Sequence, residues 1–472
     1  MVRTMIVLGV ISGWFGPLQA QYISEVLEYT PAPGQYINET PWGTPASAQT
    51  LVGGLDGTLS LGAFGGTVVF SFEHPVENDP DNPFGVDFTI FGNAAGTWSE
   101  PGIVSVMADE NQNGLPDDTW YELAGSDYFF YGTRHDYRVT YTNPHQEEAA
   151  DVAWSDNDGG TDYLFANSFY RQPYYPRPAD FPAVGEDSCT FTATCLAETL
   201  GYDPMGRRIS PERAFGYADN RSGGSAPHTL PDNPYTPEKE HSGGDGFDID
   251  WAVDEQGRYV TLEAIHFVRV QTGVLGADRA LGELSTEIRG AVDVSPDASV
   301  TGRDELLVMR RLPDTIRGTR FPLEAAVFKK GRLQKDAGIT FRTDLEEVRV
   351  ENDTLFFHSP GEVTITAESG DDPRLTATGS AVLVYDSLTG AGEAQYPAAR
   401  MQVYPNPATD RIYIKGPAEA SLAIYTVTGK RIFQPGAVRG GTPVDVSSLP
   451  PGVYLLRAEW GEQVSTGRLV KQ

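Results

Sequence analysis

The sequence predicts an all-β protein made of several β-sandwich domains. Stretches in which apolar and polar residues alternate dominate the chain, and this period of two is typical of strands with one buried face. The 51 Gly and 34 Pro are spread along the chain, which favours short strands joined by turns. At 472 residues the chain is too long for one ordinary hydrophobic core, so we expect about three domains.

The alternating stretches of the first module lie far apart in the sequence. They cover residues 67–72, 86–91, 103–107, 137–141 and 265–270. In the first of them, Val68, Phe70 and Phe72 share one face. Strands separated by such long intervals favour a jelly-roll sandwich over a meander. We therefore expect residues 21–295 to form a jelly-roll module.

A second module is predicted for residues 305–385. Its expected strands cover residues 323–328, 339–343, 354–358, 362–368 and 376–385. A Ser359-Pro-Gly361 turn leads into the alternating Val363, Ile365 and Ala367. The pattern resembles a bacterial immunoglobulin-like (Ig-like) domain, which serves as a spacer in surface proteins. Residues 386–402 are rich in Gly, Ala, Ser and Thr and are predicted to form a linker.

The last segment, residues 403–472, differs from the rest in charge and in motifs. It holds eight Lys/Arg against five Asp/Glu, whereas the whole chain has a formal net charge of −30. It opens with Tyr404-Pro-Asn-Pro407, contains Leu449-Pro-Pro-Gly-Val-Tyr454 and ends near Val470-Lys471.

Together these features resemble the type A sorting domain of the type IX secretion system of Bacteroidetes. The resemblance implies a small Ig-like sandwich recognised by the secretion machinery, then cleavage by its sortase and attachment to a surface lipopolysaccharide. A short β unit with an exposed edge strand is also suited to recognition by strand pairing. Without the resemblance, the same pattern indicates one more small Ig-like sandwich.

The first 20 residues have the pattern of a secretory signal peptide. Arg3 supplies the positive charge, residues 5–15 form a short apolar stretch, and Leu18-Gln19-Ala20 offers a cleavage site. No later apolar run approaches the roughly 20 residues that a membrane-spanning helix needs, so we predict no transmembrane segment. The expected location is secreted or at the outer cell surface.

The charge and the cysteines narrow the function classes further. A strongly acidic surface repels nucleic acid and attracts cations, so we expect no nucleic-acid partner. Export permits a disulfide between Cys189 and Cys195, the only two cysteines. On a straight strand their Cα atoms would lie about 20 Å apart, too far to bridge. A turn at Thr192-Ala193 would allow the bond, so both states stay open.

Four stretches of the first module resemble a group of Bacteroidetes cell-surface proteins with a galactose-binding-like jelly roll. They are Leu61-Gly-Ala-Phe-Gly-Gly-Thr67, residues 87–104, residues 109–122 and residues 247–254. The resemblance implies binding of a glycan or of a corrinoid (cobalamin) for uptake, with an outer-membrane uptake receptor as a further partner. Fold analogy alone does not choose between these ligands.

Residues 109–118 match the first half of a calcium-binding loop. Oxygen-bearing side chains stand at positions 1, 3 and 5, and Gly114 stands at position 6, where the loop turns sharply. The predicted ligands of a structural Ca²⁺ are Asp109, Asn111, Asn113, the carbonyl of Leu115, Asp117 and Asp118. Position 12 is Trp120 where an EF-hand has Glu, although Glu122 would be a substitute. The alternative is an Asx-rich turn without metal.

Two further acidic stretches carry weaker signals. Residues 156–162 have fewer regularly spaced oxygens, which favours a plain turn. Asp248, Asp250 and Asp254 alternate on a predicted strand beside Trp251. They would either support a metal or polar ligand or form a solvated strand face.

Aromatic residues of the first module are the predicted ligand contacts. Flat rings stack on sugars or on a planar macrocycle at little entropic cost, although core packing explains many such residues. The candidates are Trp98, Trp120, Tyr128, Phe129, Phe130, Tyr131, Tyr170, Tyr174, Tyr175 and Trp251.

Catalytic motifs are missing from the sequence. It has no nucleophile elbow, phosphate loop or zinc-binding His pair, and its seven histidines are scattered singly. We therefore expect a non-catalytic surface binding protein. The alternative is a surface glycoside hydrolase or another polysaccharide-active enzyme, because two catalytic carboxyls need only converge in space.

Overall fold

The computed structural model describes residues 21–471 except 204, 279–280, 386–401, 405–407, 416–419, 427–430, 439–442, 451 and 461–462. The predicted signal peptide (1–20), nearly all of the predicted linker (386–402) and three residues of the 404–407 motif lie outside the described residues. Strands hold 43% of the residues and helices 3%, arranged in several sheets, which confirms the predicted all-β, multi-sandwich fold class.

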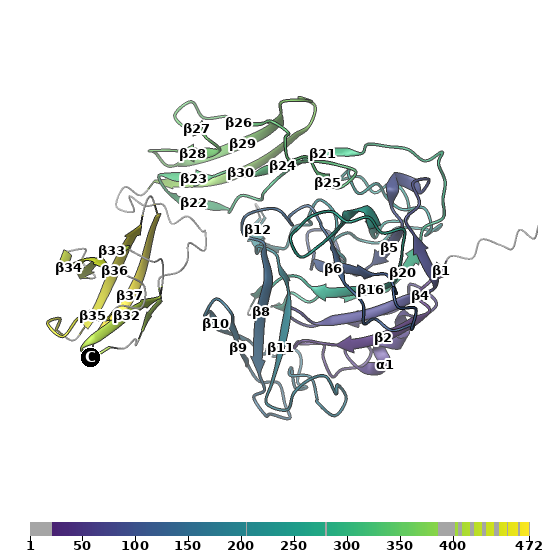
Figure 1. Ribbon diagram of the computed structural model, residues 1–472, viewed down its shortest axis with the longest axis horizontal. Coiled ribbons are helices and arrows are strands. Elements are labelled where there is room, and N and C mark those ends of the chain that lie inside the picture. Colours follow the sequence, from purple (N-terminus) through teal and green to yellow (C-terminus); the bar gives the residue numbers. More distant parts are fainter. Residues whose placement is uncertain are drawn as a thin grey trace, which may run out of the picture. The chain divides into compact units, whose positions relative to one another are not determined.

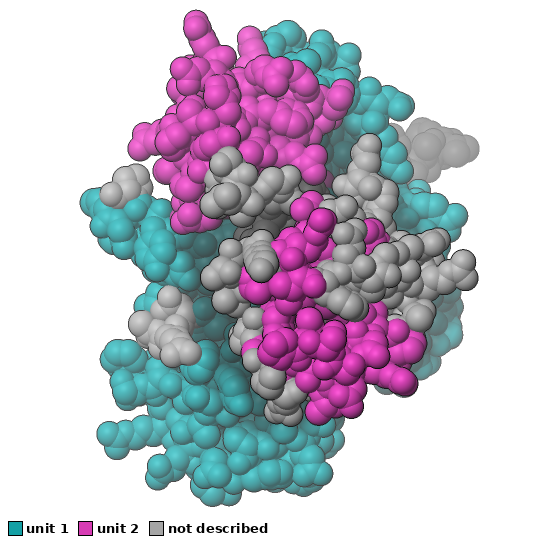
Figure 2. All heavy atoms as spheres, turned by 90° about the vertical axis from the view of Figure 1, so that its left-hand side faces the viewer, with its two compact units in different colours: residues 1–311, 325–340, 367–377 teal, residues 312–324, 341–366, 378–472 magenta. Residues whose placement is uncertain are grey.

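The chain divides into two compact units, which Figure 2 colours separately. Unit 1 comprises residues 1–311, 325–340 and 367–377, and unit 2 comprises residues 312–324, 341–366 and 378–472. The domain boundaries predicted from sequence stay a prediction.

Two facing sheets form the sandwich of unit 1 (Figure 1). The larger sheet has, in spatial order, β15 (Ala252–Val253), β7 (Tyr121–Leu123), β6 (Gly102–Met107), β16 (Ala264–Thr272), β4 (Thr67–Glu77) and β2 (Glu25–Thr30). The smaller sheet has β1 (Gln21–Tyr22), β20 (Gly290–Asp293), β5 (Phe88–Phe91) and β14 (Asp245–Phe247).

The period-two residues of these strands build the core between the sheets. Val68 of β4 is opposite Val270 of β16, and Phe70 is opposite Val268. They belong to one buried cluster with Phe88 of β5 and residues of β14 and β20. Each apolar side chain on these faces leaves water on folding, which stabilises the sandwich by roughly 25 cal/mol per Å² of apolar surface buried.

A further four-stranded sheet extends unit 1. It contains β10 (Thr161–Leu164), β9 (Val152–Asp156), β8 (Arg134–Thr142) and β11 (Ser188–Cys195). Tyr137, Val139 and Tyr141 of β8 pack under the loop that carries Tyr174 and Tyr175. Cys189 and Cys195 stand on β11, a single strand, and both are free buried thiols. The straight-strand alternative is therefore the correct one for this pair.

The hairpin strands β24 (Ala325–Lys329) and β25 (Arg332–Leu333) join unit 1, together with β21 (Glu305–Met309). Phe328 belongs to the same core cluster as Trp251 and packs on Phe215, with 5.2 Å between ring centroids. The sequence analysis places these residues in the second module, and that boundary stays a prediction.

Short elements complete unit 1 and position its loops. They are α1 (Pro45–Ala48), η1 (Gln49–Leu51), η2 (Pro83–Gly85), η3 (Ile249–Trp251), β3 (Leu59–Ser60), β12 (Gly201–Tyr202), β13 (Arg208–Ile209), β17 (Ala277–Asp278), β18 (Gly282–Glu283) and β19 (Glu287–Ile288).

Two further sheets belong mostly to unit 2. β22 (Thr315–Gly318), β30 (Thr376–Tyr385), β29 (Gly361–Ser369) and β26 (Ile339–Thr343) form one sheet, in which β22 and β30 are parallel. β23 (Arg320–Pro322), β28 (Thr354–Phe356) and β27 (Arg349–Glu351) form another. Val363 and Ile365 are buried on β29, as their alternation predicts.

The C-terminal part of unit 2 is a small sandwich. One sheet holds β31 (Gln402–Tyr404), β32 (Arg411–Lys415) and β35 (Pro443–Asp445). The other holds β34 (Arg431–Val438), β33 (Ala420–Thr426), β36 (Gly452–Trp460) and β37 (Gln463–Lys471). Ile412, Leu422 and Leu456 lie in its core. Among the described residues, no helix is long and apolar enough to cross a bilayer.

Candidate functional site

Three acidic side chains from distant parts of the sequence converge inside unit 1. Glu100 precedes β6, Asp219 lies in the loop between β13 and β14, and Glu287 begins β19. One carboxylate oxygen of each lies within 4.8 Å of those of the other two. Their exposed fractions are 9%, 0% and 3% respectively. We call these three residues the carboxylate cluster; it is the one such acidic, His or Cys group in the described part of the chain.

Backbone N–H groups hold Asp219 in place. Its Oδ1 accepts hydrogen bonds of 2.8 Å from the N–H groups of Asn93 and Ala94, and its Oδ2 accepts one of 2.9 Å from Glu287. Gly92 makes this approach possible, because a Cβ there would lie 2.2 Å from Asp219 Oδ1. The loop from residue 92 therefore closes directly over the carboxylate.

Glu100 is held by the segment that carries Glu287. The N–H of Ser285 donates to Glu100 Oε1 at 3.1 Å, and the hydroxyl of Thr286 donates to the Glu100 carbonyl at 2.8 Å. A hydrogen bond from the Trp98 side chain also lowers the pKa of Glu100. Because of this hydrogen bond, the predicted ligand residue Trp98 lies beside the cluster, and its side chain is half-buried.

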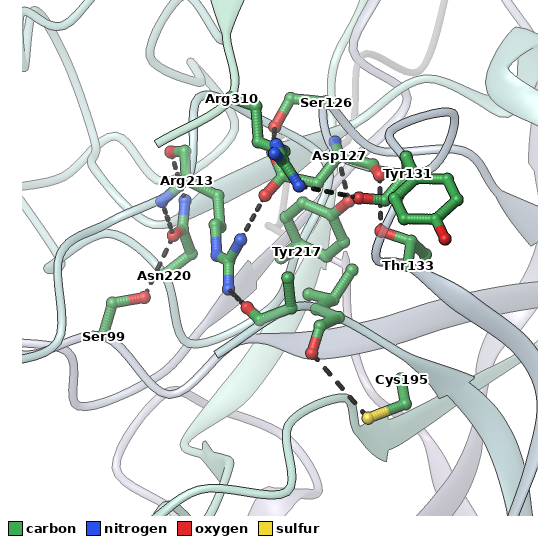
Figure 3. Close-up of polar contacts among 12 residues, drawn as sticks. Ser99, Ser126, Asp127, Tyr131, Thr133, Cys195, Arg213, Tyr217, Asn220 and Arg310 are labelled. Carbon is green, nitrogen blue, oxygen red and sulfur yellow. Dashed lines mark hydrogen bonds and ion pairs between the residues drawn. The ribbon is translucent and has the colours of Figure 1, made fainter. Parts of the chain in front are cut away.

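A buried polar network fixes the chain neighbours of two cluster residues (Figure 3). The hydroxyl of Ser99 donates to Asn220 Oδ1 at 3.0 Å, and the Asn220 side chain exchanges hydrogen bonds with the backbone of Arg213. The Arg213 guanidinium in turn pairs with Asp127 and donates to the Ala197 carbonyl. The positions of Glu100 and Asp219 thus depend on a network that extends well away from them.

Burial dominates the electrostatics of the cluster. It raises the pKa of Glu100 to about 8, with the nearby Asp219 charge adding to the effect. Burial raises the pKa of Asp219 to about 7, against three backbone hydrogen bonds that lower it. The pKa of Glu287 is also raised, by burial and then by the charges of Glu100 and Asp219. The groups that act most strongly on these pKa values include no Lys, Arg or His.

One cluster oxygen has no donor. Glu287 Oε1 is buried without a hydrogen-bond partner among the described residues. The Glu287 side chain also meets the Glu100 side chain, a contact that raises the pKa of Glu287. Because two ionised carboxylates repel and neither can donate, such a contact requires a proton or a cation between them.

Three half-buried aromatic rings lie near the cluster. Tyr36 contacts Trp42 with 5.5 Å between ring centroids and Tyr170 with 5.0 Å. The pKa of Tyr36 is raised by burial first, then by Tyr170 and by the charges of Glu287 and Glu100. The backbone links Trp42 to the cluster, because Ser60 pairs with Glu287 across β3 and β19 and donates its N–H to the Trp42 carbonyl at 2.9 Å. We call Tyr36, Trp42 and Tyr170 the aromatic rim. Only Tyr170 was among the predicted ligand residues.

Several predicted ligand residues belong to the core instead, and the prediction is wrong for them. Trp251 is fully buried against Phe215, with its indole N–H donating to the Lys330 carbonyl at 3.1 Å. Tyr174 and Tyr175 are buried under the loop that covers β8. Tyr128 and Phe130 are buried as well. Core packing, the alternative explanation for these rings, accounts for these five residues.

The remaining predicted aromatic residues are partly accessible but do not join the rim. Trp120 is half-buried beneath the Arg269 guanidinium, whose carbon lies 4.5 Å from the ring centroid. Phe129 is half-buried and packs on Tyr128 and Tyr259. Tyr131 is exposed.

The 109–118 loop is exposed and held by its own side chains. Asp109 accepts from the N–H groups of Asn113 and Gly114, and Asp118 accepts from Glu110 and Asn111. The amide nitrogens of Asn111 and Asn113 face Asp117, so their oxygens point elsewhere. Leu115 is exposed. These hydrogen bonds are those of an Asx-rich turn, and calcium binding by this loop stays a prediction.

Glu122 is not part of that loop. Its carboxylate accepts a 2.6 Å hydrogen bond from the Thr194 hydroxyl, and burial raises its pKa to about 7. Asp156 accepts from the N–H groups of Asp158 and Gly160, as the predicted plain turn requires.

The 248–251 segment is not a strand. Asp248 caps the short helix η3 by accepting from the Asp250 N–H at 2.8 Å. Asp254 accepts from the Arg258 side chain in an exposed turn. The alternating aspartates thus serve local turns and do not converge on a ligand.

Sequence reasoning missed Asp219 and Glu287 altogether. Asp219 and Glu287 are 68 residues apart, and neither stands in a recognisable motif. Glu100 lies within one of the stretches that suggested the jelly-roll family, and this was the only available signal.

The C-terminal segment matches a known family. Residues 402–472 match the model of the secretion system C-terminal sorting domain. This segment is a type IX sorting domain. The sorting domain indicates export by type IX secretion and a cell-surface or secreted location, as predicted.

Other comparisons add little. The solved structures similar to this chain include titin Ig tandem domains A164-A165 (10% identity over 36% of this chain and 98% of that chain, TM-score 0.13). They also include the adhesin InvE of Yersinia pseudotuberculosis (9% identity over 35% of this chain and 58% of that chain, TM-score 0.12). Another is surface layer protein SbsC, domains 4-9 (13% identity over 71% of this chain and 47% of that chain, TM-score 0.16). Scores this low carry no argument. No curated protein matches the sequence.

Proposed function

We propose that this protein is a surface-displayed, non-catalytic binding protein whose first unit binds a glycan at the aromatic rim. The observation that carries the proposal is that Tyr36 contacts both Trp42 and Tyr170, with Trp42 bonded through its backbone to the strand that pairs with Glu287. Rings that already touch one another lose little conformational entropy when a ligand stacks on them.

The chemistry of the rim suits a sugar. Aromatic faces stack against the apolar side of a sugar ring, and nearby polar groups accept hydrogen bonds from its hydroxyls. The resemblance of unit 1 to galactose-binding-like jelly-roll proteins supports the same ligand class. A corrinoid would also stack on such rings, and the experiment below includes it as a separate outcome.

Burial of the acids supports a binding role over hydrolysis. A glycosidase needs two carboxyls that reach the glycosidic bond from either side. Asp219 and Glu287 are almost wholly enclosed, so they suit an internal structural role better than contact with a polysaccharide.

Display at the surface completes the proposal. The type IX machinery would export the chain, its sortase would cleave it near the 386–402 linker, and an outer-membrane receptor would take up the bound ligand. A Ca²⁺ bound by residues 109–118 would stiffen an exposed loop without taking part in chemistry.

Calorimetry on the purified full-length protein tests the proposal. It is titrated with a panel of glycans and with cobalamin, each with and without CaCl₂. We expect saturable heat with a glycan and no hydrolysis product. Tyr36→Ala and Tyr170→Ala should each weaken binding by about ten-fold or more, because each loses a stacking face. Tyr385→Ala, which removes an exposed aromatic ring in unit 2, is the matched control and should bind normally.

Three outcomes would contradict it. Release of sugar from any glycan would make the protein an enzyme. Binding of cobalamin alone would assign the rim to a corrinoid. Loss of glycan binding in Tyr131→Ala, with full binding in Tyr170→Ala, would place the ligand on a different surface.

A further inference from the structure

The carboxylate cluster concentrates more negative charge than its surroundings balance. Glu100, Asp219 and Glu287 are nearly enclosed, and their ligand atoms lie within 4.8 Å of one another. Moving even one uncompensated carboxylate out of water costs several kcal/mol, so three together demand neutralisation. Either protons shared among the carboxyls or a metal cation would neutralise this charge.

The unpaired oxygen of Glu287 favours a cation. Asp219 is fully served by three backbone N–H donors, and Glu100 receives Ser285 N–H. Glu287 has a side-chain hydrogen bond with Ser285, but its Oε1 is buried with no donor among the described residues. Buried polar atoms are nearly always satisfied, and an unsatisfied one commonly marks an ion that the coordinates do not contain.

The spacing also suits a hard cation. Ca²⁺ holds its oxygen ligands at about 2.4 Å, so two ligands on opposite sides lie at most about 4.8 Å apart. The three carboxylate oxygens meet this limit. Carboxylates are the ligands that Ca²⁺ prefers, and it accepts hydroxyl and carbonyl oxygens to complete six to eight positions. The Ser285 hydroxyl is close by in sequence but already contacts the Ser60 hydroxyl at 2.7 Å and accepts from the Gly62 N–H at 3.0 Å, so waters would complete the shell.

We propose that Glu100, Asp219 and Glu287 form a binding site for one divalent cation, with Ca²⁺ as the expected ion. The ion would join the segment before β6, the 219 loop and β19, which are far apart in sequence. Trp98 is hydrogen-bonded to Glu100, and the charge of Glu287 acts on Tyr36. The bound ion would therefore also hold the segments next to the aromatic rim in place. The inference does not depend on which ligand the rim binds.

The experiment compares Glu287→Gln with Glu283→Gln in the full-length protein. Glu283 is a matched control because it too is buried, carries an unpaired oxygen and lies on the same segment, but outside the cluster. Thermal unfolding is followed with EDTA and with 1 mM CaCl₂ (about a thousand-fold above a micromolar Kd), and calorimetry gives affinity and stoichiometry. We expect wild type and Glu283→Gln to gain several degrees in Tm with Ca²⁺. Glu287→Gln should lose that gain and bind Ca²⁺ at least about ten-fold more weakly at this site.

Asp117→Asn separates this site from the predicted loop site. Calcium stabilisation that survives Asp117→Asn and disappears in Glu287→Gln supports the proposal. Stabilisation lost in Asp117→Asn and kept in Glu287→Gln would assign the ion to the loop and overturn it.

A proton-sharing cluster gives a different result. In that case the Tm of the Asp117→Asn variant would not rise with Ca²⁺. Glu287→Gln would raise the Tm in EDTA, because it removes a buried carboxyl. That pattern would overturn the proposal. If Glu287→Gln does not unfold cooperatively, Glu100→Gln is the second variant, and the same loss of the Ca²⁺ gain is expected.

Discussion

Several buried acidic residues make the free energy of unfolding of unit 1 depend on pH. Burial raises the pKa of Asp87 to about 7, of Asp245 to about 8 and of Glu283 to about 7. In each case the folded protein holds its proton at a pH where the unfolded chain has released it. Stability is therefore greatest below the unfolded pKa and falls as pH rises toward the folded value.

Glu283→Gln should show this pH dependence at one residue. Its folded pKa is about 7 against an ordinary value of 4.5, so ionising the buried side chain opposes folding. We expect the substitution to raise the free energy of unfolding by about 3 kcal/mol at pH 8 and by less than about 1 kcal/mol at pH 5. Urea unfolding of wild type and variant at both pH values, in EDTA, measures the difference.

An equal effect of Glu283→Gln at pH 5 and pH 8 would contradict this account. Gln can still accept the 2.7 Å hydrogen bond that the Gln35 N–H makes to Glu283, so the comparison isolates the charge. An exposed acid such as Glu147 serves as control, since Glu147→Gln should change the stability by under about 0.5 kcal/mol.

The buried Arg213–Asp127 ion pair is a second residue-scale test. Arg213→Met leaves Asp127 and the Ala197 carbonyl without their partner inside the protein. Breaking a buried pair on one side costs about 3–5 kcal/mol. Arg207, six residues before Arg213, forms an ion pair with Asp203, but the Arg207 side chain is 67% exposed. Arg207→Met should therefore cost under about 1 kcal/mol, measured by the same urea unfolding.

At the scale of elements, the β24–β25 hairpin depends on Gly331. This residue has φ +68°, and a Cβ there would lie 2.1 Å from the Trp251 indole nitrogen. Gly331→Ala should destabilise unit 1 by at least about 2 kcal/mol, because it combines a left-handed backbone with a clash in the core. Gly338 lies nearby in sequence with open space around it, and Gly338→Ala is the control. Equal thermal unfolding of both variants would show that the hairpin does not pack on Trp251.

For the whole molecule, the sorting domain determines the destination. A chain that ends before residue 402 lacks the segment that the secretion machinery recognises, so we expect it to stay in the periplasm. Protease treatment of intact cells of a type IX-secreting bacterium, followed by blotting, distinguishes surface from internal protein. The full-length chain with Tyr385→Ala should reach the surface normally. Surface display of the shortened chain would show that another segment directs export.

The sequence alone established the properties that depend on local pattern. Alternating residues such as Val68 and Phe70 must bury one strand face, so the all-β class followed from them. The motifs of residues 403–472 are contiguous, and for this reason the sorting domain is recognisable from sequence alone. The spacing allowed either one continuous strand through the two cysteines or a turn between them, and β11 is the continuous strand.

Only the tertiary structure decided which side chains meet. Trp251 and Tyr174 have the composition of ligand contacts but lie in the core, because burial depends on what packs over a ring and not on the ring itself. Glu100, Asp219 and Glu287 carry no shared signal in sequence, since three loops and strands bring them together only after the sandwich closes. Convergence of distant residues is a property of the folded chain, and the candidate site rests entirely on it.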